Sequence, residues 1–372
     1  GAKGGLAMIW QERLNGDSLG WLLEADGDNP SIRYFALRDL LGRPADDADV
    51  VAARAQIMSS GPVPVILDAQ HPEGYWQQPG GGYRKYQGTV WQIMLLGEMG
   101  ADPNDERVRR GCEYVLNHTV ASNGGFAASN TKAVPSGVIH CLNGNLLQAL
   151  IRLGYLGDVR VQRALDWQVR SITGAEPIEY YQSGTSGPDF GCAVNDKLPC
   201  GWGAVKALKA LVAVPDAART PDVQQAIEHG AAFVLRHDVA KADFPYTEKI
   251  SSAWFKLGFP LSYWSDVLET LTVLVAVGYG GDGRLDEAYD WLLSKQDANG
   301  RWKLENSLNG KMWIDIEKRG RPSKWITLRA LRVGDPRLPV LGPDEAGIAH
   351  LATGFAVKGR LVEHDLHAFA RF

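Results

Sequence analysis

The stretches ILDAQHPEGYW at residues 66–76 and LLSKQDANGRW at residues 292–302 share one pattern, an apolar run that leads into Gln-x-x-x-Gly-x-Trp. Looser copies lie between them, and the aligned apolar or aromatic positions recur at intervals of roughly 50–65 residues. These positions are Val65, Tyr114, Trp167, Phe233 and Trp291. A period of this size indicates stacked two-helix units, because one such unit cannot bury its apolar face alone.

A second repeated stretch has helical spacing of its apolar residues. PSIRYFALRDL at residues 30–40 matches PSKWITLRAL at residues 322–331, with one extra residue in the earlier copy. Related inner helices are expected at residues 88–99, 141–153, 202–214 and 264–277. Outer helices are expected before the inner ones, near residues 18–25, 47–59, 105–118, 158–171, 222–237 and 284–296. Strand patterns are sparse, so the sequence predicts an all-α fold, an (α/α)6 toroid of six helical hairpins around a central cavity.

Composition bounds the function and the domain organisation. The 372 residues carry a net charge of −4, which argues against a nucleic-acid partner, and no apolar run approaches the ~20 residues of a membrane span. Four cysteines and an N-terminus without a signal-peptide pattern predict a cytoplasmic protein. We expect an N-terminal extension over residues 1–17, the toroid over 18–333, and a C-terminal extension or cap over 334–372. A small-molecule substrate and no cofactor are expected, and the oligomeric state stays open.

The two Gln-x-x-x-Gly-x-Trp endings resemble the QW repeats of squalene cyclases, and the chain is thereby similar to the terpenoid cyclase and protein prenyltransferase superfamily at the level of the fold. This resemblance implies a toroid in which Gln hydrogen bonds and Trp stacking tie outer helices to loops. The Asp-x-Asp-Asp motif of the cyclases does not occur, and YWSDVLE at residues 263–269 has the Asp of the prenyltransferase zinc site without its Cys. The resemblance therefore implies a fold and leaves the reaction open.

Candidate catalytic residues are expected at the N-terminal ends of the inner helices, where helix dipoles favour negative charge. Asp266 and Glu269 stand three residues apart and so share a helix face. Desolvation and mutual repulsion would raise one carboxyl pKa, which would create a general acid. The alternative for this pair is a solvated or Lys-paired carboxylate at the cavity mouth.

Three further candidates precede or begin other inner helices. His140 could be a general acid or base, and Cys141 a nucleophile at a helix N-terminus. The alternative is that nearby Asn side chains cap the helix while Cys141 packs as a small apolar residue. Asp196 lies in a loop, where it is either catalytic or a capping carboxylate. No metal is expected at Cys192 and Cys200, because a Cys-x7-Cys spacing is not that of a zinc ribbon.

Aromatic and polar residues near the inner-helix starts could line a substrate cavity, although core packing or solvation explains any single one of them as well. The candidate substrate-binding residues are Tyr34, Arg33, Tyr86, Trp91, Asn145, Trp202, Tyr263, Trp264, Lys324 and Trp325. The leading hypothesis is an enzyme that performs acid–base chemistry on an isoprenoid-like or other largely apolar molecule. The alternatives are a hydrolase or lyase acting on a sugar or ester, and a non-catalytic binding or scaffold toroid.

Overall fold

The computed structural model describes residue 10 and residues 12–174 and 186–334. Over these ranges no β-strand forms, and only isolated bridges join the loops. The predicted C-terminal extension lies outside the described residues, apart from its first residue. The α-helices are α2 (Ser18–Leu23), α3 (Pro30–Phe35), α4 (Ala48–Ser59), α5 (Pro62–Asp68), α6 (Thr89–Glu98), α7 (Glu106–His118), α8 (His140–Arg152), α9 (Val159–Thr173), α10 (Gly201–Ala213), α11 (Pro221–Leu235), α12 (Val267–Ala276), α13 (Asp286–Ser294) and α14 (Lys324–Gly334).

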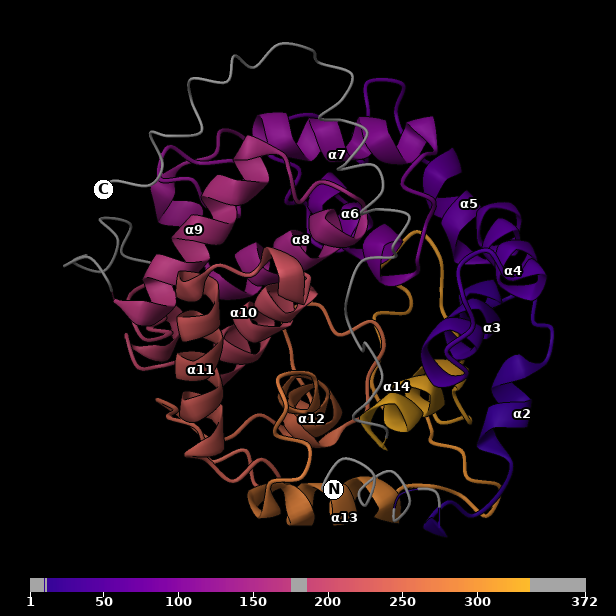
Figure 1. Cartoon of the computed structure of the whole chain (residues 1–372). Helices are drawn as coiled ribbons and strands as arrows, with labels where there is room; N and C mark the ends of the chain where they lie inside the picture. The colour runs from indigo at the N-terminus through magenta and orange to yellow at the C-terminus, as the bar shows by residue number, and fades with distance from the viewer. Residues whose placement is uncertain (1–9, 11, 175–185, 335–372) are drawn as a thin grey trace.

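The helices are arranged as a ring within a ring (Figure 1). On the inside, α8 contacts α6 and α10, α12 contacts α10 and α14, and α14 contacts α3. The ring continues between α3 and α6, where the Ser31 hydroxyl donates to the Met99 carbonyl oxygen at 2.7 Å. On the outside, α4, α7, α9, α11 and α13 each pack on the inner helix that precedes them in the chain. The predicted all-α toroid is confirmed, and the count of six hairpins stays a prediction.

The inner and outer helices differ in how much of their surface is buried, and their sequences account for the difference. In α10 every residue except Trp202 is buried, whereas α7 buries Val108, Cys112 and Val115 and turns its charged face outward. Small residues let inner helices approach closely: a Cβ at Gly144 of α8 would lie 2.4 Å from the Lys206 carbonyl oxygen of α10. The inner ring is therefore held by close backbone packing as well as by apolar burial.

A π-helical turn, Ala36–Leu40, continues α3. Such a turn holds one more residue than an α-helical turn, and this explains the extra residue of the stretch 30–40 relative to 322–331. The structural counterpart at the other end of the chain, α14, contacts both α3 and this turn. The rings of Phe35 and Trp325 meet there, with centroids 6.3 Å apart.

The two repeated stretches make the same contacts. The indole N–H of Trp76 donates to the Ile66 carbonyl oxygen at 2.6 Å, and that of Trp302 donates to Leu292 at 2.7 Å. The backbone N–H of each Trp is bonded to a threonine hydroxyl in the next inner helix, at 3.1 Å in both cases. The amides of Gln70 and Gln296 donate to backbone carbonyl oxygens of neighbouring segments, at Arg107 and Arg13. Each stretch thus joins an outer helix to the next part of the ring.

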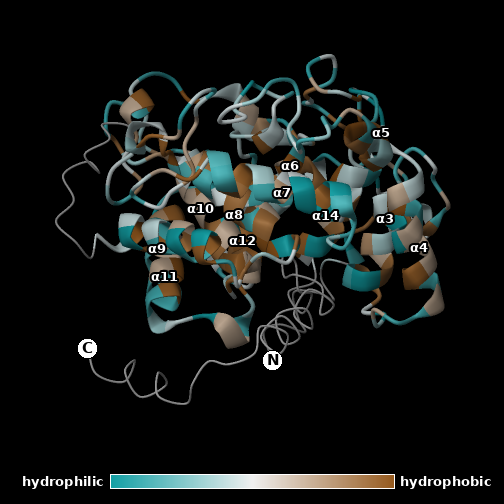
Figure 2. Cartoon of the chain, turned by 90° about the horizontal axis from the view of Figure 1, so that it is seen from above, coloured by the Kyte–Doolittle hydropathy of each residue, from teal (hydrophilic) through white to brown (hydrophobic). Residues whose placement is uncertain are grey.

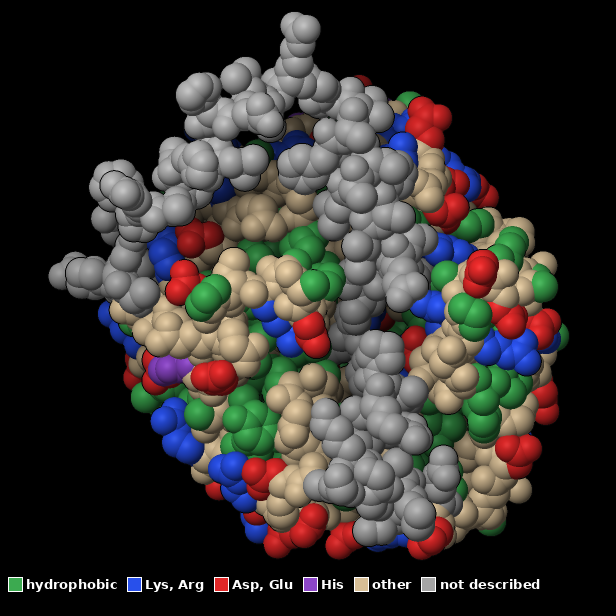
Figure 3. Space-filling view, in the orientation of Figure 1, with side chains coloured by type: hydrophobic (Ala, Val, Ile, Leu, Met, Phe, Trp, Pro, Cys, Tyr) green, Lys and Arg blue, Asp and Glu red, His purple; other side chains and the backbone are tan. Residues whose placement is uncertain are grey.

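Viewed from the edge, the irregular loops gather on one side of the helical layer (Figure 2). The long connections precede inner helices and include residues 77–88, 119–139, 236–266 and 295–323. Lys, Arg, Asp and Glu side chains mix around the rim of the face shown in Figure 3. In the part of the chain described here, no single helix is long and apolar enough to cross a membrane, although the bent pair α4 and α5 meets the criteria of length and composition.

Candidate functional site

A cavity of about 400 Å³, its open mouth included, lies inside the ring. Helix α6 provides one wall, α8 and α10 the next, and the loops before α12 and α14 close it. The wall is largely apolar, and polar groups converge at the base. The lining residues are Tyr86, Trp91, Met94, Leu95, Glu98, Asn145, Lys206, Lys209, Pro260, Leu261, Ser262, Leu308 and Met312.

Aromatic rings support one side of this cavity. Trp91 lies against Tyr263 and Tyr86, with ring centroids 5.1 and 5.2 Å apart. Its indole N–H donates to the Tyr83 carbonyl oxygen at 3.0 Å, which fixes the plane of the ring. Asn145 donates to the Ser262 carbonyl oxygen at 2.9 Å and so ties α8 to the loop before α12. The wall is therefore preformed.

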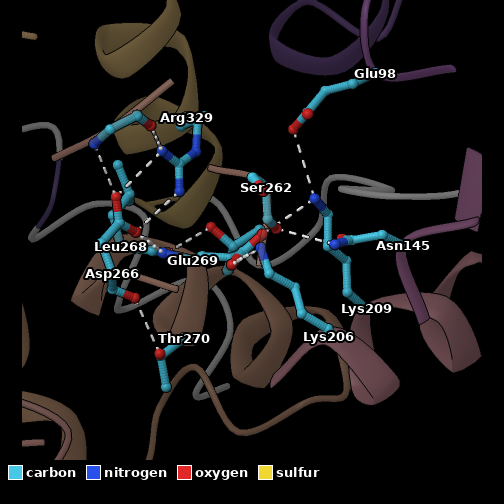
Figure 4. A network of polar contacts seen from close by, with 12 residues as sticks. Glu98, Asn145, Lys206, Lys209, Ser262, Asp266, Leu268, Glu269, Thr270 and Arg329 are labelled. Carbon is cyan, nitrogen blue, oxygen red and sulfur yellow. Dashed lines mark hydrogen bonds and ion pairs between the residues drawn. The ribbon is translucent and has the colours of Figure 1, made fainter. Parts of the chain in front are cut away.

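The base of the cavity is a buried chain of charges (Figure 4). The ammonium of Lys206 donates to Glu269 Oε2 at 2.6 Å. Lys209 lies between two carboxylates, 3.0 Å from Glu269 Oε1 and 3.5 Å from Glu98 Oε1. We call these four residues the charged floor. Its groups come from α6, α10 and α12, so it forms only when the ring closes.

Burial and the neighbouring opposite charges shift the pKa values of the charged floor in opposite directions. Burial raises the pKa of Glu269, but the ammonium groups of Lys206 and Lys209 outweigh burial and hold that pKa at about 2. Burial likewise raises the pKa of Glu98, and the same lysines bring it below its ordinary value. Burial lowers the pKa of Lys206, and its carboxylate neighbours offset only part of that shift. Glu269 is therefore ionised at pH 7, and its catalytic role stays a prediction.

Asp266 lies beside the charged floor at the N-cap of α12 and is fully buried. Its carboxylate accepts from the backbone N–H of Glu269 at 2.7 Å and of Gly258 at 3.1 Å. Arg329 of α14 donates to the same carboxylate at 3.0 Å and to the Gly258 carbonyl oxygen at 2.6 Å. Asp266 therefore caps helix α12 and forms an ion pair with Arg329. Catalysis by Asp266 stays a prediction.

A second cavity, of about 470 Å³, shares Glu98 and Lys209 with the first. Its other lining residues are Arg152, Phe259, Glu269, Thr272, Trp325, Arg329 and Arg332. Several of these stand near the C-terminal ends of α8 and α14. The charged floor therefore borders both cavities.

The structure places the His140 ring among other side chains rather than on the cavity wall. The ring is 3% exposed, with Nε2 3.0 Å from the Gly187 carbonyl oxygen and Nδ1 3.2 Å from the Gln168 amide nitrogen. These partners assign Nε2 as the donor and Nδ1 as the acceptor of a neutral ring. Burial lowers the pKa of His140 to about 4, which keeps the ring neutral at pH 7.

We expect the free energy of unfolding to fall as the pH falls from about 6.5 to about 4, because the unfolded chain protonates His140 in that range while the folded chain does not. The loss at the acidic end is roughly 3 kcal/mol. Urea titrations at several pH values should show a shallower pH dependence for His140→Asn than for the wild type. Equal pH slopes for His140→Asn and the wild type would contradict this assignment.

The remaining predicted catalytic residues lie apart from the charged floor. Burial raises the pKa of Cys141 to about 12, so the thiol is protonated at pH 7. Asp196 is exposed at a turn with φ of +52°. Neither residue lines the two cavities described. Their catalytic roles stay predictions.

The predicted substrate-binding residues divide into two groups. Tyr86, Trp91 and Asn145 line the first cavity, Trp325 lines the second, and Tyr263 supports the wall behind Trp91. The others do not line either cavity. Arg33 lies 3.7 Å from Asp49 and Lys324 3.3 Å from Asp26, while the aromatic ones pack in or against the core, namely Tyr34, Trp202 and Trp264.

The sequence analysis did not select Glu98, Lys206 or Lys209 as candidate site residues. The usable signal is a pair of lysines, three residues apart, inside the otherwise apolar GWGAVKALKALVA of α10. A charged residue inside a wholly buried helix needs a partner, since an unpaired buried charge is costly. Within the described ranges, no group of three or more His, Cys, Asp or Glu side chains is arranged to hold a metal ion.

Comparison with protein-family models and with curated sequences finds no match. Among solved structures, the chain is similar to the type II terpene cyclase MstE from Scytonema, with 16% identity, a TM-score of 0.41, and 80% of this chain and 85% of that chain covered. It is also similar to an unsaturated glucuronyl hydrolase specific for heparin, with 8% identity, a TM-score of 0.47, and coverage of 89% and 96%. A protein from Actinoplanes shows 15% identity, a TM-score of 0.39, and coverage of 91% and 99%. These likenesses concern the fold alone, and at that level the chain resembles the terpenoid cyclases.

Proposed function

We propose that the first cavity binds an isoprenoid-like or other largely apolar small molecule with one oxygen-bearing group, and that the charged floor transfers a proton to or from it. The observation that carries this proposal is the division of the cavity into an apolar wall and a buried ionic base. Such a division orients an amphipathic ligand, because the apolar part is desolvated against the wall while the oxygen meets fixed donors.

The proton chemistry follows from the charges of the floor. Glu269 is held ionised, so it is not a proton donor at pH 7. The ammonium of Lys206 is a donor with a lowered pKa, and the ionised Glu98 is an acceptor that lines the same cavity. An acid and a base that face one bound molecule can together move a proton next to a carbonyl group.

A sugar substrate fits the cavity less well. A sugar ring needs hydrogen-bond partners around its edge. Here the upper wall is formed by Leu95, Leu261, Leu308 and Met312, which offer no hydrogen bonds. The apolar ligand is therefore the function that the geometry supports best.

Binding is tested by calorimetry with dodecanoate, dodecanol and glucuronate. We expect dodecanoate and dodecanol to bind, because their alkyl chains are desolvated against the apolar wall, and glucuronate not to bind. Met312→Trp fills the cavity and should abolish binding. Lys209→Met should weaken the affinity for dodecanoate by about tenfold or more. The exposed Lys256 offers a matched control, and Lys256→Met should bind as the wild type does. Preferential binding of glucuronate, or binding that survives Met312→Trp, would refute the proposed ligand class.

Catalysis is tested with 2-dodecanone in deuterated water, by following the loss of its α-hydrogens with NMR. We expect the wild type to accelerate this exchange by about 10²-fold or more, the usual scale for a positioned acid or base. Lys206→Met should return the rate to background, and Lys256→Met should not.

A non-catalytic binding ring is the second candidate, favoured by the fact that every charge of the floor already has a partner. Binding of the ketone without exchange would decide for this second candidate.

A further inference from the structure

Cys192 and Cys200 stand on two arms of one short hairpin. Gly191 and Pro199 form an antiparallel bridge, and each cysteine directly follows one member of that bridge. The backbone N–H of Cys192 donates to Leu198 at 3.2 Å, and that of Cys200 donates to Phe190 at 2.9 Å. Side chains one residue beyond a bridge share a face of the hairpin, so both thiols extend to the same side.

The two thiols differ in their surroundings. Cys200 is the N-cap of α10, and its sulfur accepts from the backbone N–H of Gly203 at 3.4 Å. The neighbouring thiol of Cys200 favours a thiolate at Cys192 and lowers the pKa of Cys192 to about 6. The same interaction raises the pKa of Cys200 well above its ordinary value. The pair therefore holds one thiolate and one thiol near pH 7.

Access separates this pair from Cys112, and a raised pKa separates it from Cys141, which is also partly exposed. Cys192 and Cys200 are both partly exposed, and the hairpin tip between them carries Val194, which is 89% exposed. Cys112 is fully buried, and burial raises its pKa above the ordinary range. A nucleophilic thiolate that solvent reaches, next to a second thiol, is the arrangement of a reversible redox site.

We propose that Cys192 and Cys200 are a redox-active dithiol that closes to a disulfide when it meets a small-molecule disulfide oxidant. Cross-strand diagonal neighbours lie about 7–8 Å apart at Cα, slightly beyond the span of a disulfide. Closure therefore requires only a small tightening of the hairpin, and its exposed tip leaves room for this. The site lies outside both cavities described, so the proposal is independent of the proposed function.

The exchange proceeds in two balanced steps. The Cys192 thiolate attacks one sulfur of the oxidant, forms a mixed disulfide, and releases the other half as a thiolate. Cys200 then loses its proton and attacks the Cys192 sulfur, which releases the second half of the oxidant. Counted from its thiolate–thiol form, the pair gives up two electrons and one proton. The oxidant leaves as two thiols, one of which takes its proton from solvent.

The test is incubation of the whole protein with oxidised glutathione, followed by intact mass and peptide mapping. The expected product lacks two hydrogens and contains a peptide cross-linked between Cys192 and Cys200. Cys200→Ser should trap a glutathione adduct on Cys192, because the resolving thiol is gone. Cys141→Ser is the matched control and should close as the wild type does.

Three results would overturn the proposal. The first is a folded wild type that keeps all its thiols while the urea-unfolded chain is oxidised. The second is a cross-link that includes Cys141. The third is a trapped adduct on Cys200 of Cys192→Ser with none on Cys192 of Cys200→Ser, which would refute Cys192 as the attacking thiol.

Discussion

Replacing Asp266 with Ala is expected to lower the free energy of unfolding by about 3–5 kcal/mol, because the change leaves a buried arginine without its counter-charge. Arg329 meets Asp266 at 3.0 Å, and the Asp266 carboxylate is fully buried. The substitution also removes the N-cap of α12 and leaves the N–H groups of Glu269 and Gly258 without their acceptor. Urea denaturation at pH 7 measures the loss.

Two variants make this measurement specific. Asp266→Asn keeps an acceptor for the helix cap and loses the charge. It should therefore lower the free energy of unfolding by less than Asp266→Ala does. Asp216 pairs with Arg219 at 2.7 Å but its side chain is 90% exposed, so Asp216→Ala should cost less than about 1 kcal/mol. If Asp266→Asn left stability unchanged and abolished proton exchange in the ketone, the structural assignment of Asp266 would be refuted and the sequence-based acid restored.

Trp302→Ala is expected to destabilise the protein by about 3–5 kcal/mol, the range for emptying a large core site. Trp302 is fully buried, and its two N–H groups are bonded to Leu292 and Thr327. The cavity left by the indole would lie where outer helix α13 meets the start of α14. Trp76→Ala should cost a similar amount, because Trp76 makes the equivalent contacts with Ile66 and Thr89.

Controls separate packing from hydrogen bonding. Trp302→Phe keeps most of the ring volume and loses one N–H bond, so its cost should be clearly smaller than that of Trp302→Ala. Trp313 is 38% exposed, and Trp313→Ala should change the free energy of unfolding by less than about 1 kcal/mol. Equal effects of Trp302→Ala and Trp313→Ala in urea denaturation would show that the repeated stretch does not hold the ring.

The fold could be predicted because its signals are local. The helical spacing of α7, the apolar run of α12 and the repeated Gln-x-x-x-Gly-x-Trp endings can be recognised in short windows of sequence. The π-helical turn after α3 could not be predicted, although one extra residue in the stretch 30–40 marked its place. Local patterns therefore gave the layers of the toroid and missed one of their irregularities.

The candidate site was harder to predict because its partners are distant in the chain. Lys206 and Glu269 are 63 residues apart, and Lys209 and Glu98 are 111 apart. Which carboxylate meets which ammonium is set by the closure of the ring, and no local pattern contains that information. For the same reason a helix start alone could not show that His140 is enclosed by Gln168 and Gly187.

The contacts that close the ring link the two ends of the described chain. Asn15 donates its backbone N–H to Gln296 Oε1 and its side-chain amide to the Asp297 carbonyl oxygen, across 281 and 282 residues. The Ser18 hydroxyl donates to the Gly300 carbonyl oxygen across 282 residues. During synthesis these contacts cannot form until α13 and α14 have left the ribosome. The nascent chain must therefore keep its inner apolar faces from aggregating through most of translation, and the long sequence separation of these contacts predicts a slow closure of the ring.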